Sequence, residues 1–185
     1  MAILHEKRKI TYDDYCQLPS DIRAEVLDGE LLMCASPNLR HQRISRQIEI
    51  PLCHWVEEKG LGEVLYAPMD VVLSQYDVVQ PDILYVSRER FSILMEKNIQ
   101  GDPDLVVEIL SPGDEKRDTI RKKKIYEKHG VKEYWIVDSM AETITVFCLN
   151  GGLFVEKAVY QKGQILESKI LPEFSLRLEQ VFKVW

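Results

Sequence analysis

The sequence lacks two features that would place it in a membrane or in a secretory route. It contains no apolar run of bilayer-spanning length, and residues 1–7 lack the apolar core of a signal peptide. We therefore expect a cytoplasmic protein with no membrane partner. No two of the four cysteines have the sequence spacing that is typical of metal ligands. We therefore expect small buried thiols and no zinc site.

An excess of positive charge is absent as well. The chain has 24 Lys and Arg against 30 Asp and Glu, which gives a formal net charge of −6. This charge argues against a protein that coats nucleic acid non-specifically. It leaves room for an enzyme that acts on nucleic acid, because metal ions can neutralise phosphates locally.

The 185 residues contain no internal repeat, low-complexity segment or linker, so we expect a single domain over 1–185. A hairpin is predicted around Asp28-Gly29, and a helix from Ser36 to about Lys59, kinked or split at Pro51. A strand–helix–strand crossover follows at 106–138. The pattern predicts an α/β or mixed α+β fold, with helices packed against a mixed sheet.

Two carboxylates interrupt apolar segments that are predicted to be buried strands. Glu108 lies inside Leu105–Leu110, and Asp82 lies inside Val78–Val86. A buried carboxylate costs several kcal/mol unless a cation, a proton or hydrogen bonds compensate it, so each could simply pair with a lysine. Since Mg²⁺ is held by one or two carboxylates together with water and phosphate, the alternative is a shared divalent cation.

The helix after the Glu108 strand offers further candidates. Asp118, Lys122 and Tyr126 recur at steps of four and share one helix face. Lys122 could orient or deprotonate a water, or neutralise a phosphate. An ordinary ion-pair ladder is the simpler explanation, and at most one or two of Lys122, Lys123 and Lys124 can point at one site.

Glu25 and Glu30 flank the predicted hairpin turn, and either could complete the site; we favour Glu25. His41 falls in the first turn of the long predicted helix, where a lone histidine is usually a surface or capping residue. Scattered basic residues could contact phosphates, although such residues usually have no specific role. They are Arg40, Arg43, Arg46, Lys116, Arg117 and Arg121.

These residues resemble the Uma-two family of proposed restriction endonucleases, within the PD-(D/E)XK nuclease superfamily. The matching segments span nearly the whole chain: 25–31, Ser36-Pro37 with His41, 79–82, 103–112, Asp118 with Lys122 and Tyr126, and 130–138. The resemblance implies a restriction-endonuclease-like core, in which a central mixed β-sheet is flanked by helices.

The resemblance also implies hydrolysis of phosphodiester bonds in DNA with Mg²⁺ or Mn²⁺ as cofactor. Asp82 and Glu108 would be the metal ligands, with the Ile109 carbonyl as a further oxygen. Leu110 stands where the superfamily usually has its lysine, and members of this type carry that lysine on the following helix, which corresponds to Lys122. An enzyme that cuts both strands could act as a homodimer.

Two other classes of protein compete with the enzyme. One is an inactive nuclease-fold module that binds DNA or a protein partner. The other is an assembly protein in which Tyr134-Trp135 and the C-terminal hairpin form a dimer face.

Overall fold

The computed structural model describes residues 8–110 and 116–183. The side chains of residues 116–119 are not described either, so the prediction for Asp118 lies outside the described residues, as do those for Lys116 and Arg117. No helix of the described part of the chain is both long and apolar enough to cross a membrane.

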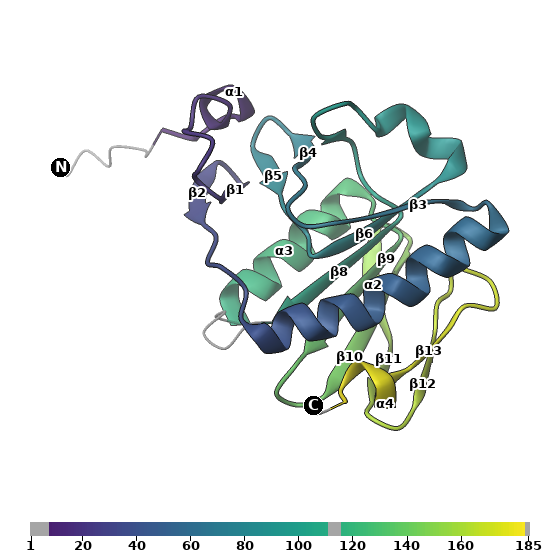
Figure 1. Ribbon diagram of the computed structural model, residues 1–185. Helices are drawn as coiled ribbons and strands as arrows, with labels where there is room; N and C mark the ends of the chain where they lie inside the picture. The colour runs from purple at the N-terminus through teal and green to yellow at the C-terminus, as the bar shows by residue number, and fades with distance from the viewer. Residues whose placement is uncertain (1–7, 111–115, 184–185) are drawn as a thin grey trace.

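The centre of the molecule is a six-stranded mixed sheet, in the order β11-β10-β9-β8-β6-β3 (Figure 1). Strands β8 and β9 are parallel and joined by helix α3, while the other neighbours are antiparallel. This arrangement confirms the predicted crossover and the mixed sheet. The elements are β3 (Gly62–Tyr66), β6 (Ile83–Ser87), β8 (Leu105–Leu110), α3 (Lys116–His129), β9 (Glu133–Asp138), β10 (Thr143–Asn150) and β11 (Leu153–Gln161).

A smaller five-stranded sheet, in the order β2-β1-β5-β4-β7, lies beside the N-terminal helix. Its hairpin turns at Asp28-Gly29, where both residues have positive φ (52° and 81°), as predicted for this dipeptide. The elements are α1 (Tyr12–Tyr15), β1 (Ala24–Leu27), β2 (Glu30–Met33), β4 (Val71–Ser74), β5 (Asp77–Val79) and β7 (Ile99–Gln100).

The predicted single strand Val78–Val86 is wrong. The chain leaves β5 in the small sheet at Val79 and enters β6 in the large sheet at Ile83. Pro81 lies in the crossing segment, because its nitrogen cannot donate a ladder hydrogen bond. Asp82 therefore stands immediately before a strand of the large sheet.

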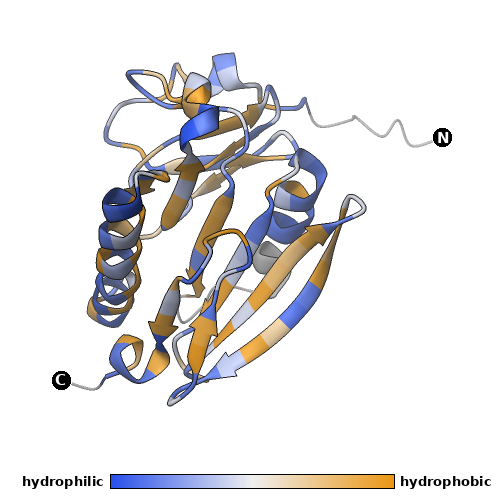
Figure 2. Ribbon diagram, turned by 90° about the vertical axis from the view of Figure 1, so that its right-hand side faces the viewer, coloured by the Kyte–Doolittle hydropathy of each residue, from blue (hydrophilic) through white to orange (hydrophobic). Residues whose placement is uncertain are grey.

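Helices α2 and α3 cover opposite faces of the large sheet, which places this sheet between two helical layers (Figure 1). Alternate residues of β8 divide between the faces: Leu105 and Val107 pack with α2, and Val106 packs with α3. The inner strands are accordingly mostly hydrophobic (Figure 2). By the same alternation, Glu108 lies on the α3 face.

Helix α2 runs unbroken from Leu39 to Lys59, so the predicted split at Pro51 does not occur. Its buried stripe of Ile44, Ile48, Leu52 and Val56 packs on the sheet both before and after the proline. This burial outweighs the loss of one helical hydrogen bond. The helix ends at Gly60, which has the left-handed conformation that terminates helices.

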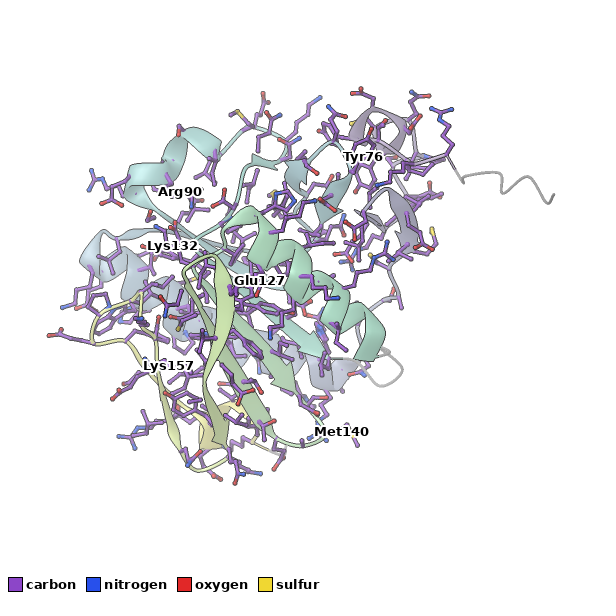
Figure 3. The ribbon with its side chains drawn as sticks, turned by 180° about the vertical axis from the view of Figure 1, so that it is seen from behind. Tyr76, Arg90, Glu127, Lys132, Met140 and Lys157 are labelled. Atoms are coloured by element: carbon purple, nitrogen blue, oxygen red, sulfur yellow. The ribbon has the colours of Figure 1, made fainter. Side chains whose placement is uncertain are left out.

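The C-terminal segment closes the α2 side of the core with β12 (Ile165–Glu167), β13 (Ser175–Arg177) and α4 (Leu178–Val181). A short 3-10 helix, η1 (Arg88–Ile93), follows β6. On the α3 side, the Glu127 carboxylate accepts the Phe154 N–H and so joins α3 to β11 (Figure 3).

Tyr134 and Trp135 are both fully buried, so the expectation that this pair forms a dimer face is wrong. Trp135 stacks on Phe174 with 6.4 Å between ring centroids, and Tyr134 packs beside Tyr126 at 5.1 Å. Alternation along β9 sends one ring to each face of the sheet, where it forms part of the core.

Candidate active site

The register of the large sheet brings the two predicted acids together. Strand β6 pairs antiparallel with β8 so that Ile83 lies opposite Val107. Asp82 directly precedes Ile83 and Glu108 directly follows Val107, so the two acids lie at the same end of the β6–β8 pairing, where the charge of Asp82 acts on Glu108. Both side chains are mostly buried, with 18% and 12% of their surface exposed.

Asp82 is held through a single oxygen. Its Oδ2 accepts the Ile109 N–H at 2.8 Å and lies 3.1 Å from Nε2 of His41. His41 sits in the first turn of α2, where Asn38 Oδ1 caps its backbone N–H at 2.9 Å. His41 is buried, with 7% exposed, and it contacts a predicted catalytic acid. The expectation of a surface or capping role was therefore wrong. Two signals pointed to His41: its place in the first turn of the predicted helix, and its presence with Ser36-Pro37 among the segments that resemble the family.

Glu108 is also held through one oxygen. Its Oε1 accepts the Tyr126 hydroxyl at 2.6 Å and lies 3.0 Å from Lys122 Nζ. Burial raises the pKa of Glu108 to about 7; the charges of Asp82 and Glu25 act in the same direction, and Lys122 and Tyr126 oppose it.

Lys122 bridges two carboxylates, because its Nζ lies 2.8 Å from Glu25 Oε1 as well as beside Glu108. Burial alone would lower the pKa of Lys122, but the two carboxylates outweigh burial and raise this pKa well above its usual value. The same Glu25 oxygen accepts the Gln80 N–H at 2.7 Å. The structure thus brings Glu25 into the cluster, as the sequence analysis favoured.

The other two lysines of this run point elsewhere. Lys123 lies over the Phe147 ring, 3.9 Å from its centroid, and Lys124 is exposed. Successive helical residues diverge by about 100°, so only one member of the run can reach the sheet. The choice among the three lysines is thereby decided in favour of Lys122.

Several predicted candidates are engaged away from the acids. Glu30 forms an ion pair with Arg121 at 2.8 Å beside the hairpin. Arg40 donates to the Ser139 carbonyl. By contrast, Arg43 and Arg46 line the same cleft as the acids and form no ion pair with any described residue.

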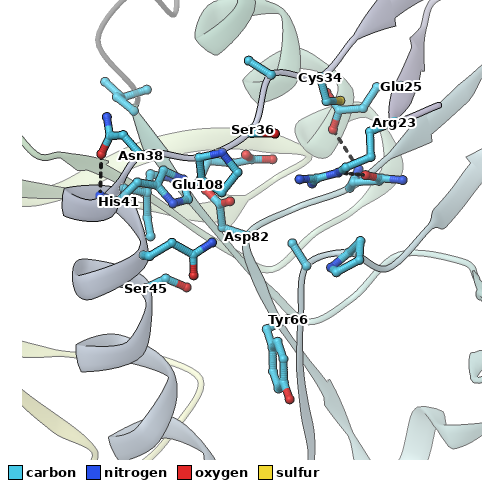
Figure 4. A pocket seen from close by; sticks show the side chains of 18 of the residues that line it. Arg23, Glu25, Cys34, Ser36, Asn38, His41, Ser45, Tyr66, Asp82 and Glu108 are labelled. Atoms are coloured by element: carbon cyan, nitrogen blue, oxygen red, sulfur yellow. Dashed lines mark hydrogen bonds and ion pairs between the residues drawn. The ribbon is translucent and has the colours of Figure 1, made fainter. Parts of the chain in front are cut away.

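The acids lie in a cleft of about 1380 Å³ between the start of α2, the β1–β2 hairpin and the ends of β3 and β8 (Figure 4). We call this space the cleft; Asp82, Glu108, Glu25 and Lys122 form its floor. Tyr134 also lines the cleft, and its buried hydroxyl has no hydrogen-bond partner among the described residues.

No group of three or more His, Cys, Asp or Glu side chains in the described residues is arranged as a ready metal site. Glu25, the nearest third carboxylate, is occupied by Lys122. Two carboxylates remain, and this number is enough for Mg²⁺, which keeps several water ligands.

A mixed sheet between two helical layers, with paired acids on adjacent strands and a lysine from the crossover helix, defines a restriction-endonuclease-like protein. The chain belongs to the Uma2 (Uma-two) family, described as "Putative restriction endonuclease", whose sequence profile matches residues 12–179. The family resemblance inferred from the motifs is thereby confirmed.

Among the solved structures with this fold is one described as "a putative nuclease belonging to DUF820" from Anabaena variabilis ATCC 29413. The two are 19% identical with a TM-score of 0.80, over 94% of this chain and 97% of the other. This likeness confirms the predicted fold class. Comparison with curated proteins gives no match.

Proposed function

We propose that this protein is a metal-dependent endonuclease that hydrolyses phosphodiester bonds in DNA. The observation that carries the proposal is that Asp82 and Glu108 lie at the same end of the β6–β8 pairing, inside one open cleft, with Lys122 bound to Glu108. A structural ion pair would need only one acid for one lysine. Here Lys122 contacts two carboxylates, Glu25 and Glu108, and the charge of Asp82 also acts on Glu108, which favours a site that takes up further positive charge.

The residues present fit Mg²⁺ or Mn²⁺. Hydrogen bonds from the described residues reach only Oδ2 of Asp82 and Oε1 of Glu108, so the second oxygen of each acid remains available as a ligand. Asp82 and Glu108 would hold the ion, and the Ile109 carbonyl is a candidate third oxygen. A bound ion would lower the pKa of a water ligand and stabilise charge on the phosphate.

The protein's own groups orient the reaction. His41 and the Ile109 N–H fix Asp82, while Tyr126 and Lys122 fix Glu108. Lys122, held between two carboxylates, keeps its proton and acts as a fixed positive charge for a phosphate oxygen rather than as a base. Leu110 on β8 occupies the position of the usual catalytic lysine and carries no charge, so Lys122 on α3 would supply the cation instead.

In the proposed step, the oxygen of a water bonds to phosphorus as the ester bond to the leaving sugar oxygen breaks. One proton of the water ends on that leaving oxygen, and the other passes to solvent. Arg43 and Arg46, on the wall of the cleft formed by α2, would contact phosphates on either side of the cut.

The test is cleavage of plasmid and oligonucleotide DNA with Mg²⁺ or Mn²⁺, and with a chelator as control. Asp82→Ala, Glu108→Ala and Lys122→Ala should each reduce the rate by at least about a hundredfold, the scale of a lost electrostatic contact in a transition state. Lys124→Ala, on the exposed side of the same helix, should cleave like the wild type.

Cleavage that survives all three substitutions would reject the assignment. The competing inactive module predicts no cleavage by the wild type and no binding of Mn²⁺. Isothermal titration with Mn²⁺ separates the two, because Glu108→Gln weakens metal binding only if Glu108 is a ligand.

A further inference from the structure

The cleft carries an unusual share of the exposed apolar surface. Thirteen large hydrophobic side chains are exposed in the described residues, and four of them line this cleft. The four are Met33 (65% exposed), Leu39 (65%), Ile50 (58%) and Tyr66 (55%). Apolar groups gathered at the mouth of a charged cleft indicate a ligand that offers apolar surface as well as charge.

Tyr66 is the most informative of these residues. Its ring makes no stacking or cation contact, and its hydroxyl makes no hydrogen bond, with any described residue. Figure 4 shows the ring apart from the other labelled side chains, below Asp82 and to the right of Ser45. An aromatic ring in this position is free to receive another flat group.

The backbone ties Tyr66 to the acidic floor. Tyr66 ends β3 opposite Ile83, the residue directly after Asp82, and the next residue, Ala67, donates its N–H to the Asp82 carbonyl at 3.0 Å. Neighbouring strands are about 4.8 Å apart. Because Tyr66 and both acids also line the same cleft, a flat group stacked on Tyr66 would belong to a nucleotide near the phosphate bound by the acids.

Charge around the ring fits a nucleic acid backbone. Arg43 and Arg46 lie three residues apart on the face of α2 that lines the cleft. A base in an intact duplex offers only its edge, because both of its faces are covered by neighbouring bases. An unpaired base offers its face, and an aromatic ring beside arginines is the usual platform for such a base.

We propose that the cleft takes single-stranded nucleic acid, with one unpaired base stacked on Tyr66 next to the scissile phosphate. This inference rests on the proposed nuclease function and names its substrate class. The face of the base covers the Tyr66 ring, and the flanking phosphates lie against Arg43 and Arg46.

The test measures binding in the absence of cleavage. Fluorescence anisotropy, in a Glu108→Gln background, compares a single strand of about a dozen nucleotides, within the usual site range, with its duplex. The single strand should bind more tightly. Tyr66→Ala should raise its Kd by about 5- to 150-fold, the range for one lost base stack, and leave the duplex Kd unchanged. Tyr66→Phe should bind like the background protein.

Two controls isolate the stack. Tyr76→Ala removes an exposed tyrosine outside the cleft (Figure 3) and should leave both Kd values unchanged. A strand with abasic sites in place of its bases should already bind weakly, and Tyr66→Ala should then cause no further loss.

The outcomes separate this inference from the proposed function. The inference would be overturned if the single strand and the duplex bound equally, if Tyr66→Ala left the Kd unchanged, or if neither probe bound. Absence of binding by either probe would favour a protein ligand at the exposed apolar residues of the cleft. A wild type that binds the strand through Tyr66 but never cleaves it would overturn the nuclease proposal alone.

Discussion

Replacing Lys122 by methionine should destabilise the protein strongly, because this lysine is the shared cation of Glu25 and Glu108. Its Nζ lies 2.8 Å from Glu25 and 3.0 Å from Glu108, and the three side chains are at most 15% exposed. Methionine fills a similar volume but leaves both carboxylates without their counter-ion. Removing one partner of a buried ion pair costs about 3–5 kcal/mol.

For a chain of this length, such a loss corresponds to a Tm lower by about 6–20 °C. Thermal unfolding followed by circular dichroism at neutral pH measures it. The double variant Lys122→Met with Glu108→Gln should regain much of the stability, because the amide can still accept the Tyr126 hydroxyl and carries no charge. DNA cleavage should stay absent in the double variant.

The pH dependence gives a second check on the same reasoning. The pKa of Glu108 is already raised, and loss of the Lys122 charge raises it further. The destabilisation should therefore grow as the pH rises above 7, because the wild type then holds ionised Glu108 beside Lys122, whereas the variant has no counter-ion for this buried carboxylate. If Lys122→Met lowered the free energy of unfolding by less than about 1 kcal/mol, the scale of an exposed ion pair, the buried cluster would be refuted. A loss of stability that did not change with pH would refute the charge coupling.

Three further predictions concern other groups. Tyr134→Phe should raise the free energy of unfolding by about 1 kcal/mol in chemical denaturation, because it removes a buried hydroxyl that has no partner among the described residues; a loss of stability would reveal a partner. Asp77 is fully buried, and hydrogen bonds from His129 and other groups lower its pKa despite this burial. The contribution of ionised Asp77 to the free energy of unfolding is therefore complete above pH 4 and is lost as the pH falls below 4. The Tm difference between wild type and Asp77→Asn should thus narrow in acid, and a constant difference would contradict this. His41→Ala should weaken Mn²⁺ binding by about 10- to 100-fold in calorimetry, since His41 orients Asp82; unchanged affinity would exclude that role.

Local chemistry made much of the fold predictable. The unbroken apolar run of β8 indicated a strand covered on both faces, and Asp28-Gly29 indicated a tight hairpin. The spacing of Lys122 and Tyr126 placed both on one helix face, and both contact Glu108. These signals depend only on neighbours within a few residues, so they can be recognised in the sequence without knowledge of the fold.

Long-range partners could not be predicted in this way. The sequence pattern predicted one strand over Val78–Val86, with Pro81 at an edge or a strand start, whereas the chain changes sheets there. The family resemblance included His41 but did not show that it would meet Asp82, 41 residues away, and one alternative placed Tyr134-Trp135 on a dimer face although both are buried. In each case the deciding contact comes from another element.

The sequence by itself therefore determined which residues are unusual: acids in apolar strands, a lysine on the following helix, and a helix start near Ser36. The tertiary structure alone decided that Asp82 and Glu108 lie at one end of the β6–β8 pairing, that Lys122 rather than its neighbours contacts Glu108, and that Tyr66 is exposed in the same cleft. The reason is physical. Side-chain direction follows from local periodicity, but proximity follows from strand register and helix packing, which are set by burial over the whole chain.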